Sequence, residues 1–230
     1  INSVVDIRDK TNSLIVKEAE KLGIKIHWKS TVVNTNGYKK INSIEIMKLS
    51  DDGTSVIREK KKEECDCLGI SGGWTPAVHL FTQSGGKLKF RDEDQLFIPS
   101  IYSSDQISIG SCNGDLTLDE ILKNTQKSLK EFLNLKNTEY ENIEVLSSTN
   151  KSKRNIWLLP SDKPIGKTKP FVDYQNDATA KDIKLALREG FRSIEHVKRY
   201  TTTGMGTDQG KLGNMHALGI IADTAGVKMG

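Results

Sequence analysis

The first stretch of the chain alternates short apolar runs with an amphipathic segment. Residues 3–7 (SVVDI) predict a strand, and residues 24–28 (IKIHW) predict another. Between them, TNSLIVKEAEKLG has the apolar spacing of a helix that begins near Thr11 and ends at Gly23. A strand, a helix and a second strand within so few residues predict a βαβ unit.

From residue 31 onward the pattern is that of strands and tight turns. Residues 31–49 and 54–60 predict three strands joined at Asn36-Gly37 and Asp52-Gly53, which is a β-meander. An apolar strand is predicted next at 65–71 (CDCLGIS), followed by GGWTP, in which Pro76 suits the first position of a helix. This order is typical of the nucleotide domains of flavin-linked disulfide-reductase-like proteins. We therefore expect an α/β fold that contains part of a two-dinucleotide-binding-domain architecture.

The second half of the chain changes from mixed structure to helices. The pattern predicts a loop and hairpin at 85–99, a strand with a glycine turn at 106–114, and a long helix at 116–132. Residues 134–170 are polar and rich in proline around one apolar strand at 156–159, which indicates a domain boundary.

Three short helices are predicted beyond that boundary. The first runs from a Thr179 cap to Gly190, the second begins at Ser193, and the third covers 212–224 and is closed by Gly226. We therefore expect partial FAD/NAD(P)-binding-like dinucleotide domains at 1–133, a linker at 134–170 and a small, mainly helical module at 171–230.

Composition narrows the class of protein. Of the 230 residues, 36% are hydrophobic and 28% are charged, and no apolar run is long enough for a membrane span or a signal peptide, so a cytoplasmic protein is expected. The three cysteines lack the spacing of a disulfide framework or a zinc site. The chain lacks an initiating methionine and stops after an apparent helix end, which suggests an internal piece of a longer protein.

The net charge of +4 is unevenly distributed. Residues 151–230 carry 14 Lys and Arg against 8 Asp and Glu, whereas residues 1–150 carry 20 against 22. The cationic surplus suits an anionic cofactor or an acidic protein surface. Few aromatics and no recurring basic stripe argue against nucleic acid.

The richest candidate chemistry lies in the segment 196–211, HVKRYTTTGMGTDQGK. It combines three consecutive threonines, three glycines and three cations between two predicted helices. Glycines allow the backbone to approach a ligand, and backbone N–H groups, hydroxyls and a lysine suit a phosphate. The alternative is a solvated connection between helices. The candidate cofactor-binding residues of this segment are Thr202, Thr203, Gly204, Gly206, Gln209 and Lys211.

A second candidate site follows the first strand, where Asp6 and Arg8 lie. In dinucleotide-binding folds an acid at this strand end bonds the ribose 2′-hydroxyl, and an arginine suits a 2′-phosphate. The glycine fingerprint expected before this strand is absent from the sequence, so a purely structural Asp6 is the alternative. Gly72 and Gly73, in the later glycine turn, are the other candidate cofactor-binding residues.

No residue has the surroundings of a catalytic acid, base or nucleophile. The four histidines are dispersed along the sequence, and packed or surface roles suit them. In flavin-binding relatives of this architecture, the strand before the long helix ends in Gly-Asp, and the Asp holds the ribityl chain. Here Ser111 follows Gly110, which argues against a flavin in this half of the chain.

Taken together, the segment FVDYQNDATAKDIKLALREGFRSIEHVKRYTTTGMGTDQGK (171–211), SGGWTPAVHL and GSCNG resemble the alpha subunit of heterotetrameric bacterial sarcosine oxidase. The resemblance covers nearly the whole chain. It implies a bound NAD and a small helical module, followed by a folate-binding, aminomethyltransferase-like domain outside this sequence that uses tetrahydrofolate. It also implies a beta subunit and smaller subunits as partners, with FMN at the alpha/beta interface.

The reaction implied by this resemblance is the oxidation of sarcosine to glycine. Oxygen becomes hydrogen peroxide, and the methyl carbon is released as formaldehyde or passed to tetrahydrofolate. On this interpretation the segment 202–211 lines the alpha side of the FMN site, and Asp6 and Arg8 contribute to the NAD site.

Two alternatives stay open. One is a subunit of an opine- or proline-oxidising complex, in which a related module carries four cysteines for an iron–sulfur cluster. The aligned positions here are Asp173, Gln175, Asp208 and Gly213, so we predict no cluster, since clusters generally require thiolates. The other alternative is a non-catalytic scaffold that retains nucleotide folds only to carry partners.

Overall fold

A computed structural model of the chain describes residues 1–103, 105–135, 145 and 155–229. The chain divides into two compact units. The first comprises Ile1–Lys10, Glu18–Gly69 and Ile156–Met229, and the second comprises Thr11–Lys17 and Ile70–Asn155. Among the described residues, no helix has both the length and the apolar character needed to cross a lipid bilayer. Part of the predicted 134–170 linker, residues 136–144 and 146–154, lies outside the described residues.

The predicted βαβ unit is present at the start of the chain. It consists of β1 (Ser3–Val5), α1 (Leu14–Lys21) and β2 (Lys25–His27), and the two strands pair in parallel. Parallel pairing requires a crossover connection, which α1 supplies. The register places Asp6 directly after β1, at the carboxyl end of the parallel pair.

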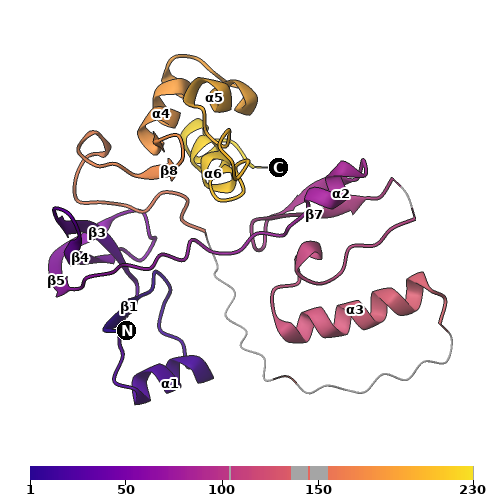
Figure 1. Cartoon of the computed structure of the whole chain (residues 1–230), viewed down its shortest axis with the longest axis horizontal. Helices are drawn as coiled ribbons and strands as arrows, with labels where there is room; N and C mark the ends of the chain where they lie inside the picture. The colour runs from indigo at the N-terminus through magenta and orange to yellow at the C-terminus, as the bar shows by residue number, and fades with distance from the viewer. Residues whose placement is uncertain (104, 136–144, 146–154, 230) are drawn as a thin grey trace. The chain divides into compact units, whose positions relative to one another are not determined.

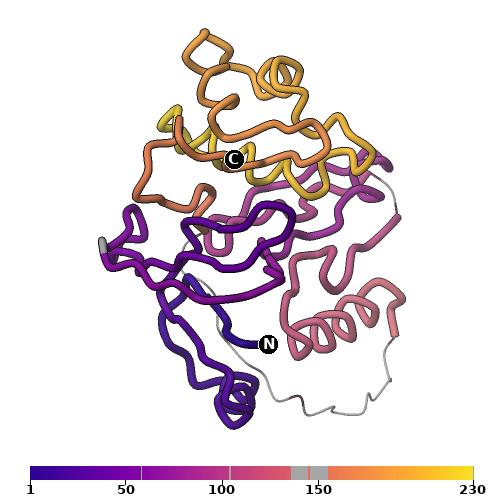
Figure 2. The backbone as a smooth tube through the Cα atoms, turned by 60° about the vertical axis from the view of Figure 1, so that its left-hand side comes forward, coloured from indigo at the N-terminus to yellow at the C-terminus, as the bar shows by residue number. Residues whose placement is uncertain are grey.

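The predicted meander is also confirmed. Strands β3 (Ser30–Gly37), β4 (Ile41–Leu49) and β5 (Val56–Glu64) form an antiparallel sheet in the order β3-β4-β5 (Figures 1 and 2). The central strand β4 supplies most of its core, because Ile44, Ile46, Met47 and Leu49 are all buried. At Gly37 a Cβ atom would lie 2.0 Å from the Lys40 carbonyl oxygen, so this turn requires glycine.

Three predicted strands are wrong: residues 65–71, 106–109 and 156–159 form no strand. An apolar run becomes a strand only where a neighbouring edge pairs with its backbone. Ile70 is instead 76% exposed, while Trp157 and Leu158 pack against the core of the C-terminal helices. The helix expected from Pro76 begins three residues later, as α2 (His79–Gln83).

The second unit contains the predicted hairpin and long helix. The hairpin is formed by β6 (Lys87–Arg91) and β7 (Leu96–Ile101), which pair antiparallel. A short 3-10 helix, η1 (Gly110–Asn113), precedes α3 (Leu118–Phe132). Thr117 and Glu120 form a reciprocal capping box at the start of α3, which fixes the helix boundary.

The C-terminal module has its own apolar core. Its elements are η2 (Ile165–Lys167), β8 (Phe171–Asp173), β9 (Ala178–Thr179), α4 (Ala180–Arg188), α5 (Ile194–Thr201) and α6 (Asn214–Ala225). The three helices gather together in both views (Figures 1 and 2). Ile183, Val197 and Ile220 are at most 2% exposed at the centre of this core. The predicted helices are confirmed, and the short β8–β9 hairpin is an addition that the sequence pattern did not predict.

Replacing Thr179 by alanine should destabilise the module. The Thr179 hydroxyl accepts a hydrogen bond from the Asp182 N–H, and the Asp182 carboxylate accepts one from the Thr179 N–H. Loss of such a cap costs about 1 kcal/mol. Urea unfolding of Thr179→Ala should therefore show a lower free energy of unfolding, whereas Lys181→Ala, an exposed change in the same turn, should unfold like the wild type.

Candidate functional site

The candidate segment forms a compact loop between α5 and α6. α5 ends at Thr201, and Thr202 follows in the left-handed conformation with φ of 59°. Thr203 and Gly204 are buried, whereas Thr202, Gln209 and Lys211 are exposed. The structure therefore places six of the predicted site residues on one loop, but only part of that loop faces solvent.

The threonine hydroxyls donate within the loop. The Thr201 hydroxyl donates to the Val197 carbonyl oxygen at 2.8 Å, so the Thr203 hydroxyl donates to Thr201 Oγ1, also at 2.8 Å. The Thr202 hydroxyl donates to the Thr201 carbonyl oxygen at 2.6 Å. These hydroxyls thus stabilise the end of α5 rather than pointing their protons outward.

The turn between β8 and β9 clamps this loop through three side chains. Asp173 Oδ2 accepts a hydrogen bond from the Gly204 N–H at 2.8 Å. Gln175 Oε1 accepts from both the N–H and the hydroxyl of Thr207 at 2.6 Å. Asn176 Nδ2 donates to the Thr202 carbonyl oxygen at 3.2 Å. We call this set of contacts the turn–loop clamp.

Asp173 is the centre of the clamp. It is 6% exposed, and besides Gly204 its carboxylate accepts from the N–H groups of Gln175 and Asn176 and from Asn176 Nδ2. Burial alone would raise the pKa of Asp173, but these hydrogen bonds to the charged form outweigh burial and leave the pKa below its ordinary value. The carboxylate is therefore ionised wherever the module is folded near neutral pH.

Two glycines in the loop make room for neighbouring side chains. A Cβ on Gly204 would lie 2.1 Å from Asn214 Oδ1, and a Cβ on Gly206 would lie 2.5 Å from Gln175 Oε1. Gly204 also has a φ of +71°, which side chains rarely adopt. The glycines thus allow protein groups to approach the loop backbone closely.

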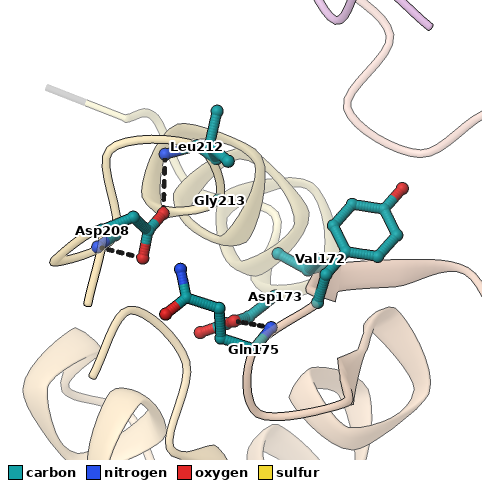
Figure 3. Close-up of a pocket in the computed structure, with 8 residues that line it drawn as sticks. Val172, Asp173, Gln175, Asp208, Leu212 and Gly213 are labelled. Carbon is teal, nitrogen blue, oxygen red and sulfur yellow. Dashed lines mark hydrogen bonds between the residues drawn. The ribbon is translucent and has the colours of Figure 1, made fainter. Parts of the chain in front are cut away.

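A small cavity lies beside the clamp (Figure 3). Its volume is about 30 Å³, enough for about one water molecule. Four residues that line it align with the cysteines that bind an iron–sulfur cluster in the related opine- or proline-oxidising module. They are Asp173, Gln175, Asp208 and Gly213. Asp208 accepts hydrogen bonds from the N–H groups of Gly210 and Leu212, so its carboxylate serves the loop backbone.

Within the described residues, no group of three or more His, Cys, Asp or Glu side chains is arranged to hold a metal ion. The four cavity positions carry no thiol. The absence of an iron–sulfur cluster remains a prediction, and the structure contributes the finding that the four positions converge.

Two loop side chains remain directed at solvent. In the described part of the chain no hydrogen bond or ion pair engages the Lys211 ammonium, and Gln209 Nε2 donates only to the Gly206 carbonyl oxygen, at 2.9 Å. Most backbone N–H groups of the loop, in contrast, already have protein acceptors. The exposed donors available to an anion are therefore chiefly side chains.

Asp6 and Arg8 form a separate site in the same compact unit. The Arg8 guanidinium donates to both Asp6 oxygens, with Nη2 to Oδ2 at 2.7 Å, and the Arg8 N–H donates to Oδ1. Burial raises the pKa of Asp6, but the bonds and charge of Arg8 outweigh it and leave the pKa below its ordinary value. These two predicted residues thus neutralise each other.

Gly72 and Gly73 belong to the other compact unit. Both are exposed in a segment without regular structure, and Gly73 has a φ of +103° with open space where a Cβ would lie. The described structure gives these two glycines no partner that would define a ligand site.

Sequence reasoning missed the turn side of the clamp. In the sequence pattern Asp173 and Gln175 stand out only as replacements for cysteines, and Asn176 does not stand out at all. The available signal was the Asp-Tyr-Gln-Asn-Asp run, since Asp and Asn side chains favour turns by bonding nearby backbone groups. That signal predicts a turn, but not that the turn holds a loop some thirty residues later.

Comparison with known proteins identifies the relatives of this chain. Residues 167–230 match the sarcosine oxidase A3 domain. The chain is 30% identical over 98% of its length to sarcosine oxidase subunit alpha of Corynebacterium sp. (strain P-1), and 34% identical over 86% of its length to that of Rhizobium meliloti (strain 1021). It spans 24% and 19% of those relatives' lengths. The predicted resemblance to sarcosine oxidase alpha subunits is confirmed.

The fold has a counterpart among solved structures. L-proline dehydrogenase from P. horikoshii superimposes with a TM-score of 0.55 over 99% of this chain and 46% of its own, at 19% sequence identity. This likeness concerns the fold alone. It supports the predicted α/β class with a β-meander and a helical C-terminal part.

Asp173→Asn should loosen the clamp. An asparagine offers one acceptor oxygen and turns an NH2 group toward N–H donors, so buried donors lose their partner at a cost of about 1–3 kcal/mol. The free energy of unfolding at pH 7, measured by urea denaturation, should fall by that amount. Asp177→Asn, in the same turn but exposed, is the matched control and should leave stability unchanged.

The difference between wild type and Asp173→Asn should also depend on pH. Because the pKa of Asp173 is lowered by folding, its stabilisation is present above its unfolded pKa of about 3.9 and is lost as pH falls through the folded value. The difference between the two proteins should therefore begin to shrink as pH falls below about 4 and vanish only below the lowered pKa of folded Asp173. Equal stability at pH 7 would contradict the role of Asp173.

Proposed function

We propose that this chain is part of the alpha subunit of a sarcosine oxidase complex. The observation that carries the proposal is its similarity to sarcosine oxidase alpha subunits over nearly its whole length. The proposed reaction is the oxidative demethylation of sarcosine to glycine, with hydrogen peroxide and either formaldehyde or methylene-tetrahydrofolate as the other products. The partners would be a beta subunit and smaller subunits.

In this proposal the chain supports cofactors rather than supplying catalytic side chains. FMN, when bound at the interface with the beta subunit, would supply the electron-transfer chemistry. Tetrahydrofolate would bind a domain outside this sequence. The proposed domain division is dinucleotide-binding domains at 1–133, a linker at 134–170 and a helical module at 171–230.

The exposed part of the loop fits one side of a phosphate site. The Lys211 ammonium and the Gln209 amide can both donate to phosphate oxygens, and a charge-assisted bond from the lysine would be the strongest contact. The turn–loop clamp holds the loop at Gly204 and Thr207, and Asp208 accepts hydrogen bonds from the Gly210 and Leu212 N–H groups on either side of Lys211, so these donors start from a fixed position. Thr203 and Gly204, both buried, would act by shaping the loop, and Thr202 and Gly206 would lie beside the ligand.

Lys211→Ala should lower FMN content and turnover in the coexpressed complex. A hydrogen bond to a charged group contributes about 1.5–3 kcal/mol, which corresponds to a loss of roughly ten- to a hundredfold in FMN affinity. The measurements are bound FMN at limiting flavin and peroxide formed from sarcosine. Lys211→Arg should retain most binding, since it keeps the charge.

Lys169→Ala is the matched control, because Lys169 is exposed just before the module and lies outside the loop. A wild-type complex that binds no FMN and forms no peroxide from sarcosine would contradict the proposed function. A functional wild-type complex with unchanged FMN affinity in Lys211→Ala would contradict only the role of the loop.

The proposed NAD contact involves Asp6 and Arg8. Both Asp6 oxygens already accept two N–H groups of Arg8, so a ribose hydroxyl must displace part of that pair. Arg8 is 47% exposed at its side chain and can move aside. The paired carboxylate would also repel a 2′-phosphate, which favours NAD over NADP.

Asp6→Ala should shift nucleotide preference toward NADP. The substitution leaves the Arg8 guanidinium free to bind a 2′-phosphate and removes the repelling carboxylate. Equilibrium dialysis of the purified complex with each nucleotide should show the ratio of NADP to NAD affinity rising about tenfold or more, because one charged hydrogen bond is gained. The double variant Asp6→Ala/Arg8→Ala should lose that gain, and an unchanged ratio in Asp6→Ala would contradict the assignment.

A further inference from the structure

A pair of aromatic rings lies at the surface of the helical module between α4 and α5. The rings of Phe191 and Tyr200 have centroids 4.8 Å apart and planes tilted by 41°. Phe191 packs against the apolar core of the module, whereas Tyr200 is 47% exposed. Phe191 therefore supports one side of the tyrosine ring, and the exposed part of the ring is an apolar surface in contact with water.

The rings border an open hollow of about 340 Å³. It is lined by Phe191, His196, Arg199 and Tyr200, all from α5 or the turn before it. His196 and Arg199 are exposed, so the hollow combines an aromatic wall with the cationic side chain of Arg199. We call these four residues the α5 face.

The surroundings of the α5 face are strongly basic. Residues 180–200 hold six Lys and Arg against three Asp and Glu. Of the three acids, Asp182 is engaged in the α4 capping box and Glu189 lies 3.9 Å from Arg188. In the part of the chain that the structure describes, Arg199 and its neighbours Arg192 and Lys198 have no ion-pair partner.

We propose that the α5 face docks an acidic segment of a partner subunit; this inference rests on the proposed function as part of a sarcosine oxidase complex. Charge complementarity identifies the partner's chemistry, because the free guanidinium of Arg199 can bind a carboxylate through two parallel hydrogen bonds. An apolar side chain next to that carboxylate would cover the Tyr200 ring. Tyrosine and arginine are the residues on which binding energy concentrates at protein interfaces, and here they stand side by side.

The test uses the full alpha chain coexpressed with its beta subunit. Arg199→Glu and Tyr200→Ser should each weaken the association of the purified subunits by about tenfold or more, measured by sedimentation or surface-immobilised binding. Wild-type affinity should fall as salt is raised, and Arg199→Glu should reduce that dependence, because it removes one of the attracting charges. Tyr200→Phe keeps the ring and should bind like the wild type.

Lys127→Glu, a charge reversal at an exposed position of α3, is the control and should leave association unchanged. Both test positions are exposed, so the melting temperatures of the variants should equal that of the wild type. If the wild-type subunits associate and both variants bind with unchanged affinity, the docking surface is overturned while the proposed function stands. If the wild-type subunits do not associate, both the docking surface and the proposed function are overturned. Binding of a single-stranded oligonucleotide through Arg199, with subunit association unaffected, would also overturn the inference.

Discussion

The organisation of the C-terminal module depends on one buried carboxylate. Asp173 lies at the end of β8 and accepts hydrogen bonds from its own turn and from Gly204 in a loop far along the chain. A buried carboxylate left without donors is costly, so the turn and the loop must adopt compatible conformations together. The position of the loop at Gly204 depends on that constraint.

This constraint also changes how the threonine–glycine segment is understood. Its composition predicts a loop whose backbone N–H groups bind a phosphate. In the folded chain most of those donors serve the protein, and the side chains that remain at the surface are Gln209 and Lys211. A rigid loop that exposes a few donors on one side is suited to a ligand that a second subunit completes, which agrees with the proposed interfacial position of FMN.

In the N-terminal part, too, candidate ligand-binding groups are already engaged by the protein itself. Asp6 and Arg8 were each candidates for contact with a ribose, and the structure pairs them with each other at the end of β1. Two opposite charges separated by one residue at a strand end neutralise each other unless a ligand competes for them. Nucleotide selectivity at such a site would come from the balance between the internal pair and the ligand, more than from either residue alone.

The elements whose signals are local can be predicted from the amino-acid sequence. The βαβ unit, the meander and the helices opened by Thr117 and Thr179 all follow from hydrophobic periodicity, turn residues and caps, which act within a few positions. The sequence also shows the resemblance to sarcosine oxidase alpha subunits. Features that depend on distant partners become visible only in the folded chain: apolar runs such as 65–71 find no strand to pair with, and Asp173 holds a loop thirty-one residues away. A hydrogen bond across that separation leaves no periodic trace in the sequence, because its donor is a backbone N–H that every residue except proline carries.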